Sequence, residues 1–155
     1  MDAVEQHILR RLMQDGRVTN KLLAQAIGLS ESATLERVRR LEANGVIQGY
    51  SVRVDPVSVG RGLEVVTTFI LKNQNPTEVQ NFTAAISQLD EVLSCYQVLG
   101  RWDFVAIIAV RDIAALQQFI NEKLIGLGLI DRMESMTVLK AVKRAHPPFP
   151  LGSGD

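Results

Sequence analysis

The sequence has few cysteines and histidines, the residues that form disulfide bonds and bind metal ions in small proteins. Among its 155 residues it has one cysteine and two histidines, and aromatic residues make up 5%. With Cys95 alone, the chain forms no internal disulfide and no zinc site from cysteine pairs. Because Cys95 sits in an apolar run, we expect a buried, inert thiol.

Long apolar stretches are also missing. No run approaches the roughly 20 residues that a membrane-spanning helix needs. The start of the chain, MDAVEQHILRR, lacks the basic start and apolar core of a signal peptide. These absences predict a cytoplasmic protein.

The chain has no excess charge of either sign, with 17 Lys+Arg against 17 Asp+Glu. A small asymmetry exists, because residues 1–61 carry 9 basic and 7 acidic side chains and residues 62–155 carry 8 and 10. A nucleic-acid-binding role therefore needs local arginine clusters and repetition by oligomerisation, since phosphate contacts supply most sequence-independent affinity.

No set of residues with recognisable catalytic spacing is present. His7 and His146 are far apart, no glycine-rich phosphate loop follows a strand, and no Ser/His/Asp arrangement appears. We therefore predict a protein that is not an enzyme and that holds no cofactor or metal.

The most informative stretch is 28–50, GLSESATLERVRRLEANGVIQGY. It opens with a tight turn, and the Ser30 hydroxyl is well suited to accept from a free amide of a first helical turn. The predicted helix runs to about Asn44, where Gly45 follows at the position that favours left-handed backbone.

This helix has two different faces. Thr34, Val38 and Leu41 share a narrow side expected to be buried. The opposite side and flanks carry small polar residues and arginines: Ser32, Ala33, Glu36, Arg37, Arg39 and Arg40. A shorter helix is predicted over 19–27, and two helices joined by a glycine-containing turn form a helix-turn-helix. The alternative is a solvated amphipathic helix in an ordinary three-helix core.

The segment LERVRRLEANGVIQGY resembles the recognition helix and following strand of the leucine-responsive regulatory protein/AsnC family of transcription factors. The resemblance implies a transcriptional regulator that binds double-stranded DNA. A further helix expected over 2–14 completes a winged helix-turn-helix, and a strand is expected over 47–54.

In the second half of the sequence, the predicted strands and helices follow one another in the order β-α-β-β-α-β. Strands are expected over 63–71, 92–99, 104–110 and 130–142, and helices over 75–88 and 113–125. This order predicts a ferredoxin-like domain and an α+β fold class. The family's regulatory domain, which is related to amino-acid-binding ACT domains, has the same pattern. Apolar residues on both faces of 104–110 indicate that another subunit covers the sheet.

These patterns divide the chain into four parts. We expect a DNA-binding domain with its linking strand at 1–55, a hinge at 56–61, a ferredoxin-like effector-binding and oligomerisation domain at 62–143, and a tail at 144–155. The resemblance implies dimers that assemble further into tetramers or octamers.

The DNA-binding site is predicted on the polar face of the second helix. Arg37 and Arg40 are suited to pair with guanine or to grip phosphates. Ala33 fits against a thymine methyl, with Ser32 beside it. For Glu36 we favour an ion pair with Arg40, one helical turn away, over acceptance from cytosine. Two more arginines are placed near the DNA backbone, Arg39 and Arg53.

The turn from Gly100 to Phe104 is explained first as a hairpin connection. In the family, a turn of this type lies where dimers meet and holds small effectors, usually amino acids. The resemblance therefore implies that Asp103 meets an ammonium group, that Arg101 or backbone amides of the turn meet a carboxylate, and that Trp102 forms a wall.

The last strand departs from the family pattern. A Thr-x-Thr pair often faces the effector cleft in family members, whereas this chain has Met133 and Ser135. The resemblance implies that Ser135 keeps one hydroxyl contact with the effector and that Met133 loses the other. Two alternatives stay open, an effector-independent regulator of the same fold and an enzyme like the sirohaem decarboxylases, which share the two-part fold and use histidine and arginine. A sensor that has lost DNA binding is disfavoured by the arginines.

Overall fold

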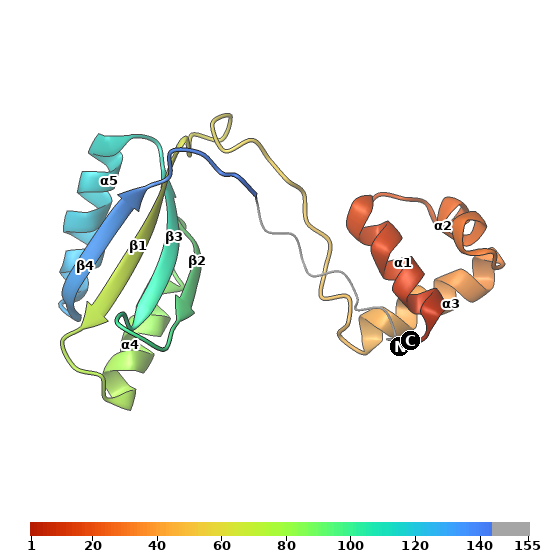
Figure 1. Cartoon of the computed structure of the whole chain (residues 1–155), viewed down its shortest axis with the longest axis horizontal. Coiled ribbons are helices and arrows are strands. Elements are labelled where there is room, and N and C mark those ends of the chain that lie inside the picture. The colour runs from red at the N-terminus through yellow and green to blue at the C-terminus, as the bar shows by residue number, and fades with distance from the viewer. Residues whose placement is uncertain (144–155) are drawn as a thin grey trace. The chain divides into compact units, whose positions relative to one another are not determined.

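The computed structural model describes residues 1–143; the predicted tail at 144–155 lies outside this range. The chain divides into two compact units, residues 1–53 and residues 54–142 (Figure 1). Within the described part of the chain, no helix is long and apolar enough to cross a membrane.

The first unit contains three helices, α1 (Ala3–Gln14), α2 (Asn20–Ile27) and α3 (Glu31–Ala43). Each begins at a polar side chain that accepts from a free backbone amide of the first turn. These capping residues are Asp2, Thr19 and Ser30. The helices enclose a small apolar core formed by Ile8, Leu9, Leu23 and Leu41.

The end of α3 is fixed by a Schellman motif. Gly45 has a φ of 69°, its N–H donates to Glu42, and the N–H of Val46 donates to the Leu41 carbonyl over 2.9 Å. These two bonds satisfy carbonyls that the last helical turn leaves without partners. The glycine predicted to end the helix is confirmed in that role.

The strand predicted over 47–54 is absent. Residues 48–55 belong to no helix or strand of the described chain. A strand requires hydrogen bonds to a neighbouring strand, and within residues 1–143 this segment belongs to no sheet. Its valines remain in solvent, with Val52 83% and Val54 60% exposed.

The second unit is a four-stranded antiparallel sheet with helices on one face (Figure 1). The strand order is β2-β3-β1-β4. Its elements are β1 (Leu63–Leu71), α4 (Pro76–Ile86), β2 (Val92–Gln97), β3 (Phe104–Val110), α5 (Ile113–Phe119) and β4 (Ile130–Thr137). This is the predicted ferredoxin-like topology, and the α+β class is confirmed.

Two elements differ from the prediction. The helix expected over 113–125 is α-helical only to Phe119; a π-helical turn follows at Ile120–Leu124 and a 3₁₀ turn at Ile125–Leu127. The last strand ends at Thr137, short of 142. Val138 still donates to Glu64, but β1 begins at Leu63, so later residues have no neighbouring strand to pair with.

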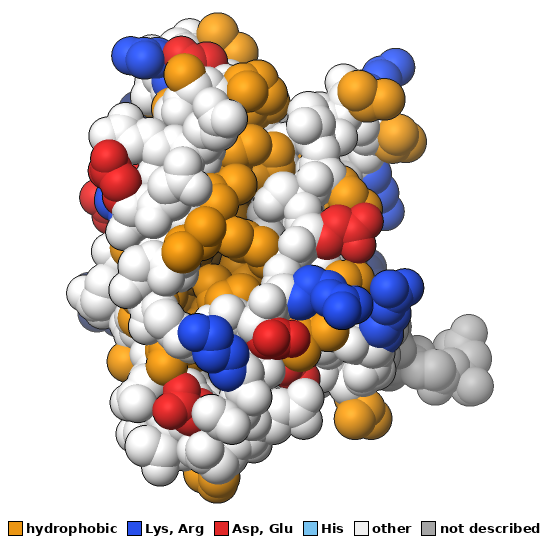
Figure 2. All heavy atoms as spheres, turned by 90° about the vertical axis from the view of Figure 1, so that its left-hand side faces the viewer, with side chains coloured by type: hydrophobic (Ala, Val, Ile, Leu, Met, Phe, Trp, Pro, Cys, Tyr) orange, Lys and Arg blue, Asp and Glu red, His pale blue; other side chains and the backbone are white. Residues whose placement is uncertain are grey.

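Both faces of the sheet carry apolar side chains. On the helix side, the Phe82 ring lies 5.4 Å from that of Phe69 and 4.6 Å from that of Phe104, measured between centroids. On the other side, Val105 and Ile107 of β3 are only half-buried. Figure 2 shows a further band of hydrophobic side chains on the face turned to the viewer. A single chain therefore leaves much of its apolar surface uncovered.

Candidate functional site

The buried and exposed sides of α3 fall where the sequence predicts them. Thr34 and Leu41 are buried and Val38 packs on the same core. The side chains predicted to face DNA lie on the accessible side: Ser32, Glu36, Arg39 and Arg40 are exposed, and Ala33 and Arg37 are half-buried.

Two of these arginines are held by the start of α1. Arg37 Nη1 lies 2.5 Å from Asp2 Oδ2, and Arg40 Nη2 lies 2.5 Å from Glu5 Oε1. The Glu5 side chain is only 9% exposed, so α3 covers it. The ion pair expected between Arg40 and Glu36 is therefore wrong, because Arg40 is turned toward α1 instead.

The two carboxylates are also tied to each other's backbone. Asp2 accepts from the Glu5 N–H at 2.8 Å, and Glu5 accepts from the Asp2 N–H at 2.9 Å, which is a capping box. For each acid, the backbone bond first and the arginine second hold the pKa below its ordinary value. The carboxylate of Glu5 in turn raises the pKa of Arg40.

The pairing of Asp2 and Glu5 with α3 is the part of this site that the sequence analysis missed. In the sequence, each acidic residue is separated from the arginine that it pairs with by 35 residue positions. The D-x-x-E spacing identifies a helix start, but only the packing of α1 across α3 brings those acids to the arginines. Each guanidinium keeps other N–H groups, because it carries five donors in all.

The Gly100–Asp103 turn is joined to the end of β1 through Asp103. Its Oδ2 accepts from the Leu71 N–H at 2.8 Å, and its Oδ1 accepts from Gln74 Nε2 at 2.9 Å. Its own N–H donates to the Phe69 carbonyl over 2.9 Å. Asp103 thus fixes the turn in place, and a carboxylate has further acceptor sites to offer.

The other predicted effector residues fall into two groups in one chain. Gly100, Arg101 and Trp102 belong to the same turn as Asp103, whereas Ser135 does not. The guanidinium of Arg101 lies 5.0 Å from the centroid of the Trp102 ring. Ser135 lies opposite Thr67 in the sheet and shares a 2.9 Å hydrogen bond with it. Since β4 and β3 flank β1 on opposite sides, Ser135 and the turn do not meet.

Comparison with known proteins decides the family. Residues 1–48 match the winged helix-turn-helix DNA-binding domain, and residues 64–148 match the Lrp/AsnC ligand binding domain. The chain belongs to the Lrp/AsnC family. It is a transcriptional regulator with a DNA-binding domain followed by a ligand-binding domain, as the sequence predicted.

Relatives resemble the chain over nearly its full length. The leucine-responsive regulatory protein of Salmonella typhimurium is 33% identical over 94% of this chain and 89% of its own length. A transcriptional regulator of Neisseria meningitidis in complex with L-methionine matches with a TM-score of 0.91 at 28% identity, covering 97% of this chain and 96% of that one. AsnC of E. coli matches with a TM-score of 0.85 at 27% identity, covering 96% and 99%.

The ion pairs predict how acid affects stability. A carboxyl whose pKa is lowered by folding stabilises the protein above its ordinary pKa, here 3.8 for Asp2 and 4.5 for Glu5, and this stabilisation is lost as the pH falls through the lowered values. We expect Asp2→Asn/Glu5→Gln to melt at a lower temperature than the wild type at neutral pH. The difference should shrink below pH 4, when followed by circular dichroism at fixed protein concentration.

Asn caps a helix as well as Asp, so this variant keeps the first cap and removes the charge. Asp131→Asn, at an exposed position of β4, is the matched control and should melt like the wild type at both pH values. A melting difference for the double variant that stays constant down to acid pH would contradict the assigned role of the two carboxylates.

Proposed function

We propose that the chain binds duplex DNA through α3 as a homo-oligomer, and that a small effector, an amino acid, alters its assembly and its DNA binding. The observation that carries the DNA assignment is the accessible face of α3, where small side chains at the N-terminal turn lie beside anchored arginines. In helix-turn-helix proteins this end of the second helix meets the base edges.

The residues of this face fall into two groups. Ser32 and Ala33 lie in the first turn, where short side chains allow close approach to base edges in the major groove. Arg37 and Arg40 follow one and two turns later, and their remaining N–H groups suit phosphate oxygens. Glu36 lies between Ser32 and Arg40 on this face, and Arg39 is exposed beside it. Arg53 belongs to the linker, and we place it near the DNA backbone. Asp2 and Glu5 then act as positioning residues, because they hold both guanidiniums before DNA arrives.

Oligomerisation follows from the uncovered apolar surface of the second unit and from the exposed valines of the linker. Pairing the same surfaces of two copies would bury Val105 and Ile107 and give the segment at 47–54 a neighbour. A two-fold dimer presents two α3 helices to half-sites about 34 Å apart, one turn of DNA.

Effector binding is placed at the Gly100–Asp103 turn and completed by another copy. Asp103 would accept from the ammonium, while backbone amides beyond Gly100 and the Arg101 guanidinium would meet the carboxylate. Trp102 would close one side. The L-methionine held by the structural relative from Neisseria meningitidis supports an amino acid as the class of ligand.

Arg37→Ala tests the DNA-binding surface. We expect its affinity for a duplex from the chain's own upstream region to fall by about 1–3 kcal/mol if Arg37 reads a base, or the salt slope to fall by about 1 if it contacts a phosphate. Fluorescence anisotropy titrations at several salt concentrations measure both quantities.

Arg10→Ala is the control for Arg37→Ala, since it removes the same charge from an exposed position of α1. Its affinity should stay near that of the wild type. An Arg37→Ala protein that is folded, oligomeric and unchanged in both affinity and salt slope would overturn the assignment of α3.

Asp103→Asn tests the effector turn. The amide keeps one acceptor for Leu71 but loses the negative charge, so we expect amino-acid binding to weaken at least about tenfold, or about 1.4 kcal/mol. Calorimetry on wild-type and variant protein with each proteinogenic amino acid, with light scattering for assembly, checks this. Wild-type protein that binds no amino acid and never changes its assembly would leave an effector-independent regulator, the second candidate.

The enzyme alternative has a simple test. His7 is the one histidine within the described residues, and it is exposed on α1. A sirohaem-decarboxylase-like enzyme would carry a coloured porphyrin ligand through purification. Retention on heparin with a steep salt dependence and no absorbance in the visible range supports the DNA-binding regulator instead.

A further inference from the structure

The end of the linker, residues 55–61, is folded as part of the second unit. This unit begins at Val54, ahead of the hinge predicted at 56–61. Asp55 accepts from the hydroxyl of Ser58 at 2.5 Å and from its N–H at 2.8 Å. The hydroxyl bond first and the N–H bond second hold the pKa of Asp55 below its ordinary value. The segment therefore begins with a capped turn and not with an open chain.

Backbone hydrogen bonds close the other end of the same turn. The N–H of Gly60 donates to the Val57 carbonyl over 3.0 Å, and the N–H of Arg61 donates to the Pro56 carbonyl over 2.7 Å. Gly60 has a φ of 72°, in the left-handed region that glycine adopts without a steric cost. The turn is thus closed on itself, and the direction of the linker depends on how this turn is held.

The Arg61 side chain fastens the turn to β3. Its Nη1 donates to the Ala109 carbonyl over 3.0 Å, and the Ala109 N–H donates to the Glu91 carbonyl over 2.8 Å. Ala109 is only 2% exposed, so the acceptor of this bond belongs to the interior of the unit. A hydrogen bond with an ionised donor is roughly twice as strong as a neutral one. One side chain therefore joins the end of the linker to the core of the second unit.

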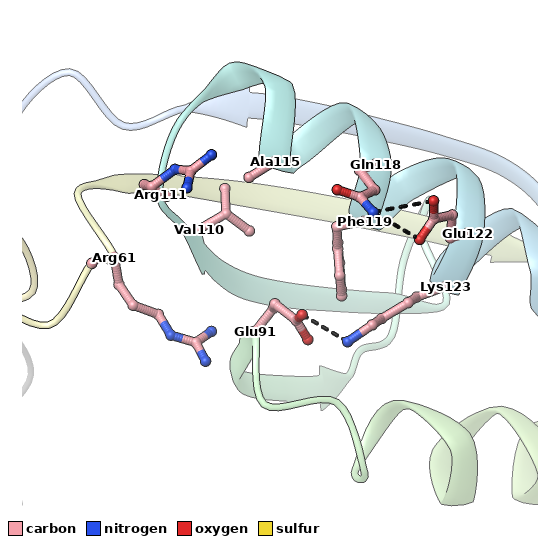
Figure 3. Close-up of a pocket in the computed structure, with 10 residues that line it drawn as sticks. Arg61, Glu91, Val110, Arg111, Ala115, Gln118, Phe119, Glu122 and Lys123 are labelled. Atoms are coloured by element: carbon pink, nitrogen blue, oxygen red, sulfur yellow. Dashed lines mark hydrogen bonds and ion pairs between the residues drawn. The ribbon is translucent and has the colours of Figure 1, made fainter.

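The carboxylate of Glu91 adds an electrostatic attraction to this bond. Figure 3 shows Arg61 and Lys123 on either side of Glu91. Lys123 Nζ lies 2.7 Å from Glu91 Oε1. Burial acts to raise the pKa of Glu91, but the Lys123 hydrogen bond and the charges of Lys123 and Arg61 outweigh it, so this pKa lies below its ordinary value. Glu91 thus carries a negative charge beside the Arg61 guanidinium.

The turn also packs against the second unit. Gly60 and Arg61 line a cavity of about 430 Å³ together with side chains of β3 and α5 (Figure 3). A Cβ atom at Gly62 would lie 3.7 Å from Val57 Cγ2 and 3.8 Å from the Arg111 carbonyl oxygen, which are ordinary contact distances. The turn and the end of β3 therefore meet at this point without a gap.

We propose that Arg61 is a positioning residue for DNA binding, because it fixes where and in which direction the linker leaves the second unit. The inference rests on the proposed function, in which a dimer presents two α3 helices to two half-sites. Linkers that start from fixed points let the DNA-binding units reach a narrow range of half-site separations, whereas a loosened turn widens that range. Arg61 therefore sets how strictly half-site spacing is selected, while base contacts stay with α3.

Hydrogen exchange on the full chain tests the fastening without DNA. Arg61→Met removes the donor and the charge but keeps a side chain of similar length. We expect the Gly60 amide of this variant to exchange at least about tenfold faster than in the wild type, because the turn opens more often. Arg61→Lys keeps a charged donor for one carbonyl and should exchange nearly like the wild type.

The matched control is Arg111→Met, which removes a neighbouring arginine whose side chain pairs with Asp112 and not with the linker. Its Gly60 amide should exchange at the wild-type rate. A Gly60 amide that exchanges at the wild-type rate in Arg61→Met, or equally fast in Arg61→Met and Arg111→Met, would overturn the proposal.

DNA affinity tests the positioning role. Duplexes from the chain's upstream region receive insertions of up to about 5 base pairs, half a turn, between the half-sites, and binding is followed by fluorescence anisotropy. At the least favourable spacing the wild type should lose at least about tenfold in affinity, and Arg61→Met less than about threefold. Arg111→Met should follow the wild type. All three should bind a duplex with one half-site equally, since α3 is unchanged.

Two outcomes separate this inference from the proposed function. An Arg61→Met protein with the wild-type dependence on spacing would overturn the positioning role, even with a faster Gly60 amide. Wild-type protein that binds none of the duplexes would refute the proposed function and with it the role of Arg61 in DNA binding, while the exchange rates would still decide whether Arg61 fastens the linker.

Discussion

The pairing of two acids of α1 with two arginines of α3 sets the chemistry of the DNA-binding unit. Asp2 and Glu5 cap one helix and at the same time hold Arg37 and Arg40 of another. The arrangement orders two long side chains, so that the proposed contact with DNA costs less rotamer freedom. It also neutralises part of the positive charge of α3 and leaves a few oriented N–H donors on a chain without net charge.

The second unit leaves part of its apolar surface uncovered in a single chain. Its sheet buries one apolar face under α4 and α5, whereas Val105 and Ile107 on the other face are only half-buried. Asp103 secures the turn at one end of the sheet, whereas Ser135 pairs with Thr67 on the opposite side of β1. An effector site that uses both needs a second copy, so a ligand there would necessarily affect assembly. Coupling of this kind typically amounts to about 1–3 kcal/mol.

Much of this was predictable because local chemistry decides it. The cap at Ser30, the glycine after α3 and the apolar residues of β1 and β3 all act within a few residues, and the family resemblance identified the helix-turn-helix. The remaining features are not local. The strand at 47–54 needs a partner that one chain lacks, and the turn of Arg40 toward Glu5 comes from helix packing. The π-helical turn after Phe119 has no sequence signal that periodicity detects.

The central claim is that the first turn of α3 meets the bases, and site-specific photocrosslinking tests it directly. A benzophenone side chain is placed at Ser32 or, as a control, at Thr77, which is exposed at the start of α4. Each protein is then irradiated with duplex DNA from the chain's upstream region. The account predicts crosslinks from position 32 to bases within each half-site and none from position 77. Crosslinks from position 77 alone would contradict it.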